Sequence, residues 1–137
     1  TDARTPLGID AAIERALRYE EAGADILFVE SPESVEEMRK ITSACSVPTV
    51  ANMVEFGRTP LYTAAELEAL GYSIMAMPVT ATFVIAKTIR DVAEILKREG
   101  SSKSLLENLL SIEACAELLG IGEIRSMERQ YATGRNG

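Results

Sequence analysis

Three short apolar runs, separated by stretches with helical patterning, organise the first part of the chain. The runs are Ile26–Val29, Pro48–Ala51 and Ser73–Met77, and they start 22 and 25 residues apart. Uninterrupted apolar runs of this length are typical of strands that are buried on both faces, and the spacing leaves room for one helix between successive strands. The pattern therefore predicts strand–helix units around a parallel sheet, which is an α/β fold.

The stretch before the first run predicts an amphipathic helix. Ile13, Ala16 and Leu17 form one apolar stripe, Asp10 is in position to cap the start, and Gly23 is a stop signal. Two later stretches, Ser34–Glu37 and Thr63–Glu66, fit the capping box, in which a hydroxyl residue and a glutamate three positions later each bond the other's backbone N–H.

A longer helix is predicted from Thr82 to the polar run 97–103, and the pattern after this run is helical only. Leu105, Leu106, Leu109, Leu110, Leu118 and Leu119 have helical spacing, Gly120 ends that stretch, and a last short helix is expected near Ile124–Tyr131. We therefore predict an α/β part over residues 1–99 and a helical tail over residues 100–137. A leucine-rich tail of this kind either folds back on its own domain or contacts a partner subunit.

The amino-acid composition of the chain excludes some classes of binding partner. With 137 residues, 47% of them apolar, the chain is long enough for one domain with a core. The net charge of −7 and the absence of a Lys/Arg cluster argue against nucleic acid and anionic membranes as partners. No apolar run approaches the roughly 18 residues of a membrane span, and no signal-peptide core is present, so we expect a cytoplasmic location.

The residue types also restrict the chemistry. The sequence has no histidine, which excludes a Ser/His or Cys/His nucleophile pair and any His-ligated metal site within this chain. Cys45 and Cys115 lack metal-ligand spacing and are interpreted as buried structural residues. Acid–base chemistry would therefore depend on carboxylates, lysines or tyrosines.

Polar residues follow each predicted strand directly. Glu30 comes after the first strand, Asn52 to Glu55 after the second, and Pro78 after the third. The carboxyl ends of parallel strands meet at one edge of the sheet, where α/β proteins place their active sites. Taken singly, Glu30 also fits a structural carboxylate and Asn52 a turn amide; their shared edge favours a functional site.

Several segments carry a family resemblance: Glu21–Asp25 (EAGAD), Phe28–Glu30 (FVE), Ala51–Glu55 (ANMVE), Thr59–Pro60 (TP), Glu66–Tyr72 (ELEALGY) and Pro78–Val79. At this spacing they resemble the isocitrate lyase/phosphoenolpyruvate mutase superfamily. Within it, the chain is most similar to the branch of 2-methylisocitrate lyase, 2,3-dimethylmalate lyase, oxaloacetate decarboxylase and carboxyphosphonoenolpyruvate phosphonomutase.

The resemblance implies a (β/α)8 TIM barrel, of which this chain supplies the C-terminal part: the end of the fifth strand, the last three strands over residues 1–99, and the helical tail. The family's substrate-binding arginine would precede Thr1. Its magnesium-binding aspartates and its loop with a catalytic cysteine have no counterpart here. Mg²⁺ is therefore expected as a cofactor whose ligands lie in the missing N-terminal half, with no metal ligand in this chain.

The resemblance also assigns candidate residues. Glu30 corresponds to a catalytic, substrate-contacting glutamate, and Asn52 to a substrate-binding amide. Met53 and Val54 are expected to line the same site, and Pro78 to help wall the pocket. The implied chemistry makes or breaks a bond next to a 2-oxo acid, through an enolate of pyruvate or a related acid.

The resulting hypothesis is a Mg²⁺-dependent carbon–carbon lyase that acts on a hydroxy acid similar to 2-methylisocitrate or dimethylmalate. This chain alone would be an incomplete, inactive half of that enzyme. The alternatives are a phosphonomutase that uses the same pocket and a non-catalytic α/β module that associates through its tail. The resemblance further implies a homo-oligomer, a homotetramer, whose C-terminal helices are exchanged between subunits.

Overall fold

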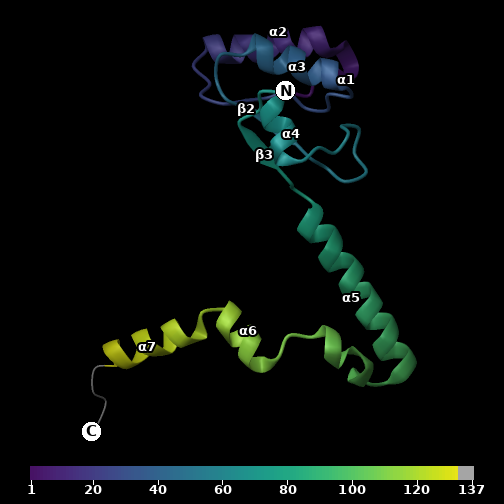
Figure 1. Cartoon of the computed structure of the whole chain (residues 1–137), viewed down its shortest axis with the longest axis vertical. Helices are drawn as coiled ribbons and strands as arrows, with labels where there is room; N and C mark the ends of the chain where they lie inside the picture. Colours follow the sequence, from purple (N-terminus) through teal and green to yellow (C-terminus); the bar gives the residue numbers. More distant parts are fainter. Residues whose placement is uncertain (133–137) are drawn as a thin grey trace. The chain divides into compact units, whose positions relative to one another are not determined.

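The computed structural model describes residues 1–132, which fall into two compact units, Thr1–Lys87 and Thr88 onward. The first unit alternates helices and short strands, and the second is helical (Figure 1). In chain order the elements are α1 (Arg4–Leu7), α2 (Ile9–Glu21), β1 (Leu27–Phe28), α3 (Val35–Ala44), β2 (Thr49–Asn52), α4 (Ala64–Ala69), β3 (Ile74–Ala76), α5 (Thr80–Glu99), the 3-10 helix η1 (Lys103–Asn108), α6 (Ile112–Leu118) and α7 (Ile121–Tyr131).

The three strands form one parallel sheet in the order β1-β2-β3, as the spacing of the apolar runs predicts. Phe28 is level with Val50, and Val50 is level with Ile74. At the other edge of β1, the Thr1 backbone N–H donates to Phe28 O (2.6 Å) and Thr1 O accepts from Glu30 N–H (3.0 Å). Thr1 therefore bonds to β1 in the way that a residue of a fourth parallel strand would.

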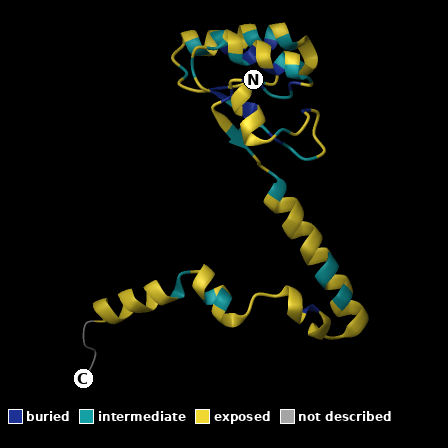
Figure 2. Ribbon diagram, viewed as in Figure 1, coloured by how far each residue is buried: buried dark blue, intermediate teal, exposed yellow. Residues whose placement is uncertain are grey.

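The two faces of the sheet differ in burial because successive side chains point to opposite sides. Leu27, Val29, Ala51 and Met53 point toward the helices and are each 3% exposed. The opposite face carries Phe28 and Ile74, which are 37% and 39% exposed. Figure 2 marks the buried residues of the first unit as short dark blue stretches, among helices and loops that are otherwise mostly exposed or intermediate.

Two apolar clusters hold α2, α3 and α4 against the sheet. The first joins α2 to β1 and α3 through Ala3, Ala12, Ala16, Leu27, Val29 and Ile41. The second joins α3 to β2 and α4 through Met38, Ala51, Met53, Leu67, Leu70 and Tyr72. α3 contributes Ile41 to one cluster and Met38 to the other, so it connects the two parts of the core.

Helix boundaries agree with the capping signals in two of three cases. Thr63 and Glu66 form the complete capping box at the start of α4. The Ser34 side chain caps α3 by accepting from Glu37 N–H, but the Glu37 side chain bonds elsewhere. The prediction that Asp10 caps α2 is wrong, since α2 begins at Ile9 after Gly8, whose φ of 87° is a conformation that glycine adopts readily.

The Glu37 side chain instead joins an ion-pair network with Arg4. The Arg4 guanidinium donates from Nε to Glu37 Oε2 (3.1 Å) and from Nη2 to Glu37 Oε1 (2.8 Å). Its Nη1 lies 2.6 Å from Glu33 Oε1. This network ties α1 to α3 and to the segment after β1, and therefore fixes the chain that follows Glu30.

The two cysteines differ in their surroundings. Cys45 is partly buried and packs against the first cluster, and burial raises the pKa of its thiol, which fits a structural role. Cys115 is exposed on α6, so the interpretation of this residue as buried is wrong.

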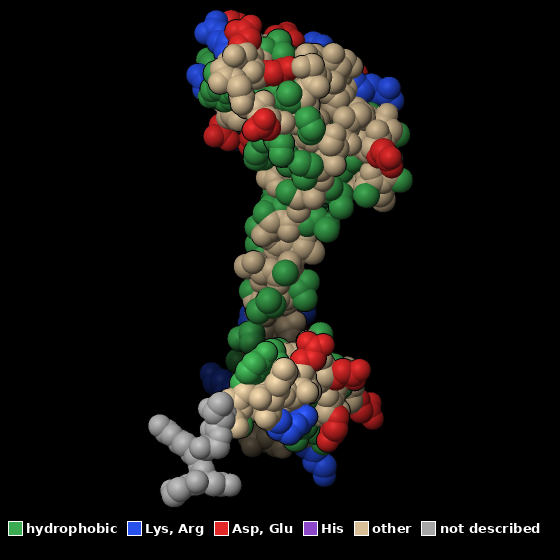
Figure 3. Space-filling view, turned by 90° about the vertical axis from the view of Figure 1, so that its left-hand side faces the viewer, with side chains coloured by type: hydrophobic (Ala, Val, Ile, Leu, Met, Phe, Trp, Pro, Cys, Tyr) green, Lys and Arg blue, Asp and Glu red, His purple; other side chains and the backbone are tan. Residues whose placement is uncertain are grey.

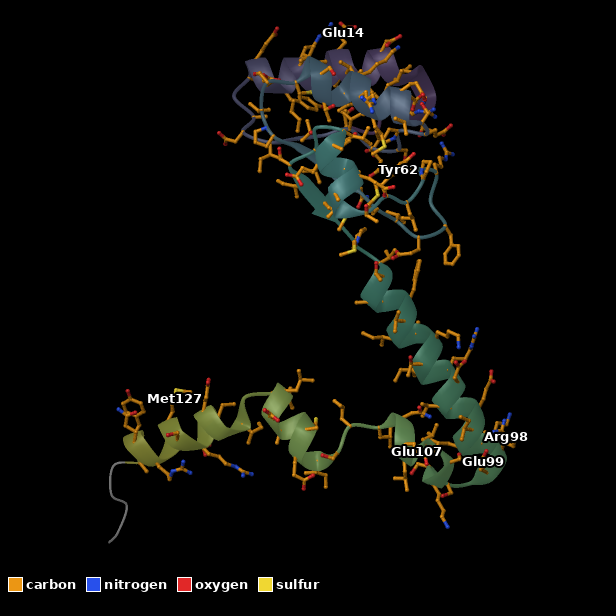
Figure 4. All side chains as sticks on the ribbon, viewed as in Figure 1. Glu14, Tyr62, Arg98, Glu99, Glu107 and Met127 are labelled. Atoms are coloured by element: carbon orange, nitrogen blue, oxygen red, sulfur yellow. The ribbon has the colours of Figure 1, made fainter. Side chains whose placement is uncertain are left out.

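The second unit is helical, as the tail pattern predicts, and most of its leucines are exposed. Leu105 is buried, whereas Leu106, Leu109, Leu110, Leu118 and Leu119 are between 51% and 74% exposed. Gly120 separates α6 from α7 with a φ of 65°. At the end of α5, Arg98 and Glu99 form an ion pair (2.6 Å; Figure 4).

The boundary between the units lies within α5, whereas the sequence pattern places the division after residue 99. The exchange of the tail between subunits stays a prediction. Within residues 1–132, no helix has the combination of length and apolar character that crossing a membrane requires.

We expect the Arg4–Glu37 pair to make stability depend on pH in the acid range. Hydrogen bonds from Arg4 lower the pKa of the Glu37 carboxyl from its ordinary value of 4.5. The contribution is therefore present above the unfolded pKa and is lost as the pH falls through the lowered, folded-state value. Measured by urea unfolding between about pH 3 and 6, Glu37→Gln should lose less free energy of unfolding on acidification than the wild type. Glu21→Gln, at the end of α2, is the control, and equal pH dependence in wild type and Glu37→Gln would contradict the assignment.

We expect Met53→Ala to lower the free energy of unfolding by about 2–5 kcal/mol, because it removes a buried side chain from the second cluster and leaves a cavity. Met77→Ala is the matched control, since Met77 is 58% exposed and its truncation should cost less than about 0.5 kcal/mol. Equal losses in urea denaturation of the two variants would show that Met53 is not part of the core.

Candidate active site

Glu30 lies two residues beyond β1, and donors hold both oxygens of its carboxylate. Oε1 accepts from Ser31 N–H (3.0 Å) and from Ser31 Oγ (3.1 Å). Oε2 accepts from the side-chain amide of Asn52 (3.3 Å). Ser31 adopts a φ of 59°, which is uncommon for a residue other than glycine and brings its N–H back to the preceding carboxylate. The position of this carboxylate is therefore set from two strand ends.

Asn52 is the last residue of β2 and comes into contact with Glu30 through the register of the sheet. Because a carboxylate only accepts, the contact fixes the orientation of the amide: Nδ2 faces Glu30. One N–H of the amide is engaged in this way, and the second N–H and Oδ1 remain available to a ligand. The pair that the sequence predicts at one sheet edge is present in the structure.

A pocket of about 230 Å³ opens beside this pair. Its lining residues are Glu30, Ser31, Asn52, Val54, Gly57, Arg58 and Thr59. Three of the predicted site residues, Glu30, Asn52 and Val54, thus share one concave surface at the carboxyl end of the sheet. Five of the seven lining residues have polar side chains, which can orient a small ligand through hydrogen bonds.

The loop that forms one wall of the pocket, residues 54–59, is tightly constrained. Phe56 adopts a φ of 62°, a conformation that is costly for a bulky side chain. Gly57 N–H donates to Val54 O (3.0 Å), and a Cβ at position 57 would lie 3.0 Å from the same oxygen. Glycine is therefore needed at this turn, and the turn directs Arg58 and Thr59 to the pocket.

Met53 lies apart from this pocket, in contrast to the expectation from the resemblance. Its side chain is 3% exposed and packs in the second cluster, and its sulfur accepts from the backbone N–H of Tyr62 (3.4 Å; Tyr62 is labelled in Figure 4). Strand alternation explains the difference, because Asn52 and Met53 point to opposite faces. Met53 supports the pocket from the core side and does not line it.

Pro78 is also outside the pocket that this chain forms. It is exposed between β3 and α5 and is not among the lining residues. The neighbouring Thr80 donates instead to Glu55, which follows Val54, so the start of α5 is tied to the wall loop. Contacts of Pro78 with a substrate stay a prediction.

Ser31, Arg58 and Thr59 line the pocket but are not singled out by the sequence. Ser31 directly follows Glu30, and a hydroxyl residue next to a strand-end carboxylate is a weak signal that could have indicated it. Arg58 and Thr59 reach the pocket only because of the bend at Phe56 and Gly57. A pattern of residue types does not reveal such a bend.

The side chains available here do not make a complete metal site. Among residues 1–132, no three Cys, Asp or Glu side chains are grouped so that they could hold a metal ion. The Glu30 carboxylate is the nearest to a ligand, and its oxygens are engaged by Ser31 and Asn52. What this edge offers a ligand within the described residues is therefore the hydrogen-bonding groups of Glu30 and Asn52.

Comparison with known proteins places these features in a family. Residues 2–97 match the family model of phosphoenolpyruvate phosphomutase. The chain is 47% identical over 135 residues to 2,3-dimethylmalate lyase of Eubacterium barkeri, an alignment that covers 98% of this chain and 47% of the relative. It is 37% identical over 132 residues to 2-methylisocitrate lyase of Halalkalibacterium halodurans, covering 96% of this chain and 44% of the relative.

Solved structures agree with the fold. The crystal structure of a 2,3-dimethylmalate lyase has a TM-score of 0.86 and 29% identity, covering 95% of this chain and 45% of that chain. The structure of oxaloacetate acetylhydrolase in complex with the product oxalate has a TM-score of 0.86 and 25% identity, and the match covers 97% of this chain and 46% of that chain.

The chain spans about half the length of the curated relatives that it matches. Its three parallel strands and the helices around them are part of a (β/α)8 barrel, in agreement with the predicted fold class. The chain belongs to the phosphoenolpyruvate phosphomutase family of the isocitrate lyase superfamily.

Proposed function

We propose that this chain supplies one part of the active site of a carbon–carbon lyase that cleaves a 2-hydroxy acid with two or more carboxylates, of the dimethylmalate or methylisocitrate type. The observation that carries the proposal is the hydrogen bond between Asn52 and Glu30 at the rim of a polar pocket. The identity of 47% to 2,3-dimethylmalate lyase supports this substrate class. The corresponding value is 34% for carboxyvinyl-carboxyphosphonate phosphorylmutase of Arabidopsis thaliana, so a phosphonomutase is the second candidate.

The proposed cleavage breaks the bond between the carbon that bears the hydroxyl group, C2, and its neighbour C3. A general base takes the proton of the hydroxyl group, the C2–O bond becomes a carbonyl, and the electron pair of the C2–C3 bond moves onto C3 as an enolate. A general acid then protonates C3, which completes the reaction. The products are a 2-oxo acid and a second carboxylic acid, which for dimethylmalate are pyruvate and propionate.

Asn52 and Glu30 have distinct roles in this scheme. Asn52 donates its second N–H to an oxygen of the substrate carboxylate or of the enolate, where negative charge collects in the transition state. Glu30 shares a proton with the substrate and, through Oε2, keeps the amide in its donating orientation. Fixed donors at such a position stabilise the transition state because they need little reorganisation during the reaction.

Mg²⁺ is part of the proposal as a cofactor that would bind the oxo acid. Its ligands are expected in the N-terminal half of the family's barrel, as the resemblance to the superfamily implies. We also propose that the whole enzyme is a homo-oligomer that associates through its C-terminal helices. The exposed leucines of the second unit support this, since large exposed apolar patches mark association surfaces.

The catalytic proposal can be tested in a chimera. In it, this chain replaces the matching segment of the 2,3-dimethylmalate lyase of Eubacterium barkeri, to which it is 47% identical. Pyruvate release from 2,3-dimethylmalate in the presence of Mg²⁺ is the readout. We expect Asn52→Ala and Glu30→Gln to lower kcat by about 100-fold or more, because each removes a group that acts in the transition state.

Asn108→Ala and Glu21→Gln are the matched controls, since neither residue is among those that line the pocket, and they should keep the turnover of the unmodified chimera. Full turnover in both Asn52→Ala and Glu30→Gln would contradict the site. The 137-residue chain alone should release no pyruvate, and release by it would refute the proposal that it is only one part of the site.

The oligomer proposal can be tested by sedimentation of the chain. We expect the wild type to sediment as an oligomer and the double variant Leu118→Glu, Leu119→Glu to shift toward the monomer, because the charges would have to be buried at the interface. The control is Leu7→Glu, Leu61→Glu, which changes two similarly exposed leucines in the first unit and should leave the assembly unchanged. A monomeric wild type would contradict the proposal.

A further inference from the structure

We propose that Arg58 is a specificity-determining residue that binds the second carboxylate of the substrate at the mouth of the Glu30–Asn52 pocket. The inference rests on the proposed function, which it extends by naming the group that distinguishes dicarboxylates from monocarboxylates.

Arg58 lies in the lining of the pocket, together with both members of the Glu30–Asn52 pair. The pocket has a volume of about 230 Å³, and Asn52 and Arg58 both line it. We therefore infer that a small dicarboxylate with one carboxylate at Asn52 places its other carboxylate at Arg58. A guanidinium is well suited to this task, since its parallel N–H groups match the two oxygens of a carboxylate.

The Arg58 side chain is held in place without having its charge neutralised. Its Nη1 donates to Thr5 Oγ1 (3.1 Å), a neutral acceptor on α1 that is 53 residues away in the sequence. Arg4 provides the contrast, because Glu33 and Glu37 occupy its guanidinium. Within residues 1–132, Arg58 forms no ion pair with a carboxylate, and this exposed residue lines the pocket.

The backbone next to Arg58 has a strained conformation at Phe56. Phe56 is 98% exposed and has a φ of 62°, so neither burial nor an easy backbone conformation explains its position. Its ring lies 6.4 Å from that of Phe83 at the start of α5. The next residue, Gly57, closes the turn on Val54, and Thr59 is buried behind it. Strain of this kind is concentrated at functional sites, and here its structural result is the placement of Arg58.

The charges in the pocket also favour this arrangement. Glu30 contributes a negative charge, but its oxygens face Ser31 and Asn52, which donate to it. The cation that lines the same pocket is Arg58. A dianionic ligand that met Glu30 without a compensating cation would be repelled, whereas a monoanionic ligand can bind at the amide of Asn52 alone.

The test compares two probes that differ in one carboxylate. Malate and lactate share the 2-hydroxy acid end, and only malate carries a second carboxylate. Each probe is titrated into the 15N-labelled 137-residue chain, and the amide shifts of residues 30–31 and 52–59 give the dissociation constants. We expect the wild type to bind malate more tightly than lactate.

The variants separate Arg58 from the rest of the pocket. Arg58→Ala should weaken malate binding about tenfold and leave lactate binding as in the wild type, because it removes one charged hydrogen-bonding group. Arg58→Lys should lie between the two, since it keeps the charge but loses the planar fork. Asn52→Ala should weaken both probes, and Arg39→Ala, which removes an arginine from the exposed side of α3, should change neither.

The remaining outcomes overturn the inference in distinguishable ways. Equal loss of malate and lactate affinity in Arg58→Ala would show that Arg58 does not bind the second carboxylate. No loss in Arg58→Ala, with loss in Asn52→Ala, would remove Arg58 from the site and leave the proposed function standing. Absence of binding of both probes to the wild-type chain would overturn the inference, while the chimera assay would still decide on the lyase activity.

Discussion

The candidate site depends on one constraint, the parallel register between β1 and β2. Phe28 is level with Val50, so the positions two residues further on, Glu30 and Asn52, are also level and lie on the same face. Their hydrogen bond is a direct result of this register. A slip of one residue would exchange the faces of β2, bringing Met53 beside Glu30 and moving Asn52 into the core. The apolar residues on the helix side resist that slip, since it would bury an amide among Met38 and Leu67.

The sequence predicts most elements of the first unit because most of them carry a strong local signal. Apolar runs locate the three strands, and the hydroxyl and glutamate of Thr63 and Glu66 locate the start of α4. The start of α2 is misjudged because Gly8 can occupy a positive φ and begin the helix without a side-chain cap. The short helix α1 is missed altogether. Its place depends on the ion pairs of Arg4 with residues 29 and 33 positions away, which no local pattern records.

The site is predicted only in part, and the reason is geometric. Glu30, Asn52 and Val54 reach the pocket because they follow regular strands, whose alternation can be read from sequence. The same alternation turns Met53 toward the core, so it does not line the pocket that this chain forms, and its contact with a substrate stays a prediction. Ser31 and Arg58 reach the pocket through positive φ values at Ser31 and Phe56, which sequence patterns do not predict for residues other than glycine.

The partly exposed row formed by Phe28, Val50 and Ile74 has a consequence for how this chain tolerates substitutions. The face toward α2, α3 and α4 finds its packing partners within the chain, whereas the row on the other face is left partly open to solvent. The hydrophobic side chains that remain on the surface can be seen in Figure 3. Substitutions on the first face therefore affect whether this chain folds. Substitutions on the second face affect what can pack against the sheet, so the two faces of the sheet are under separate selective constraints.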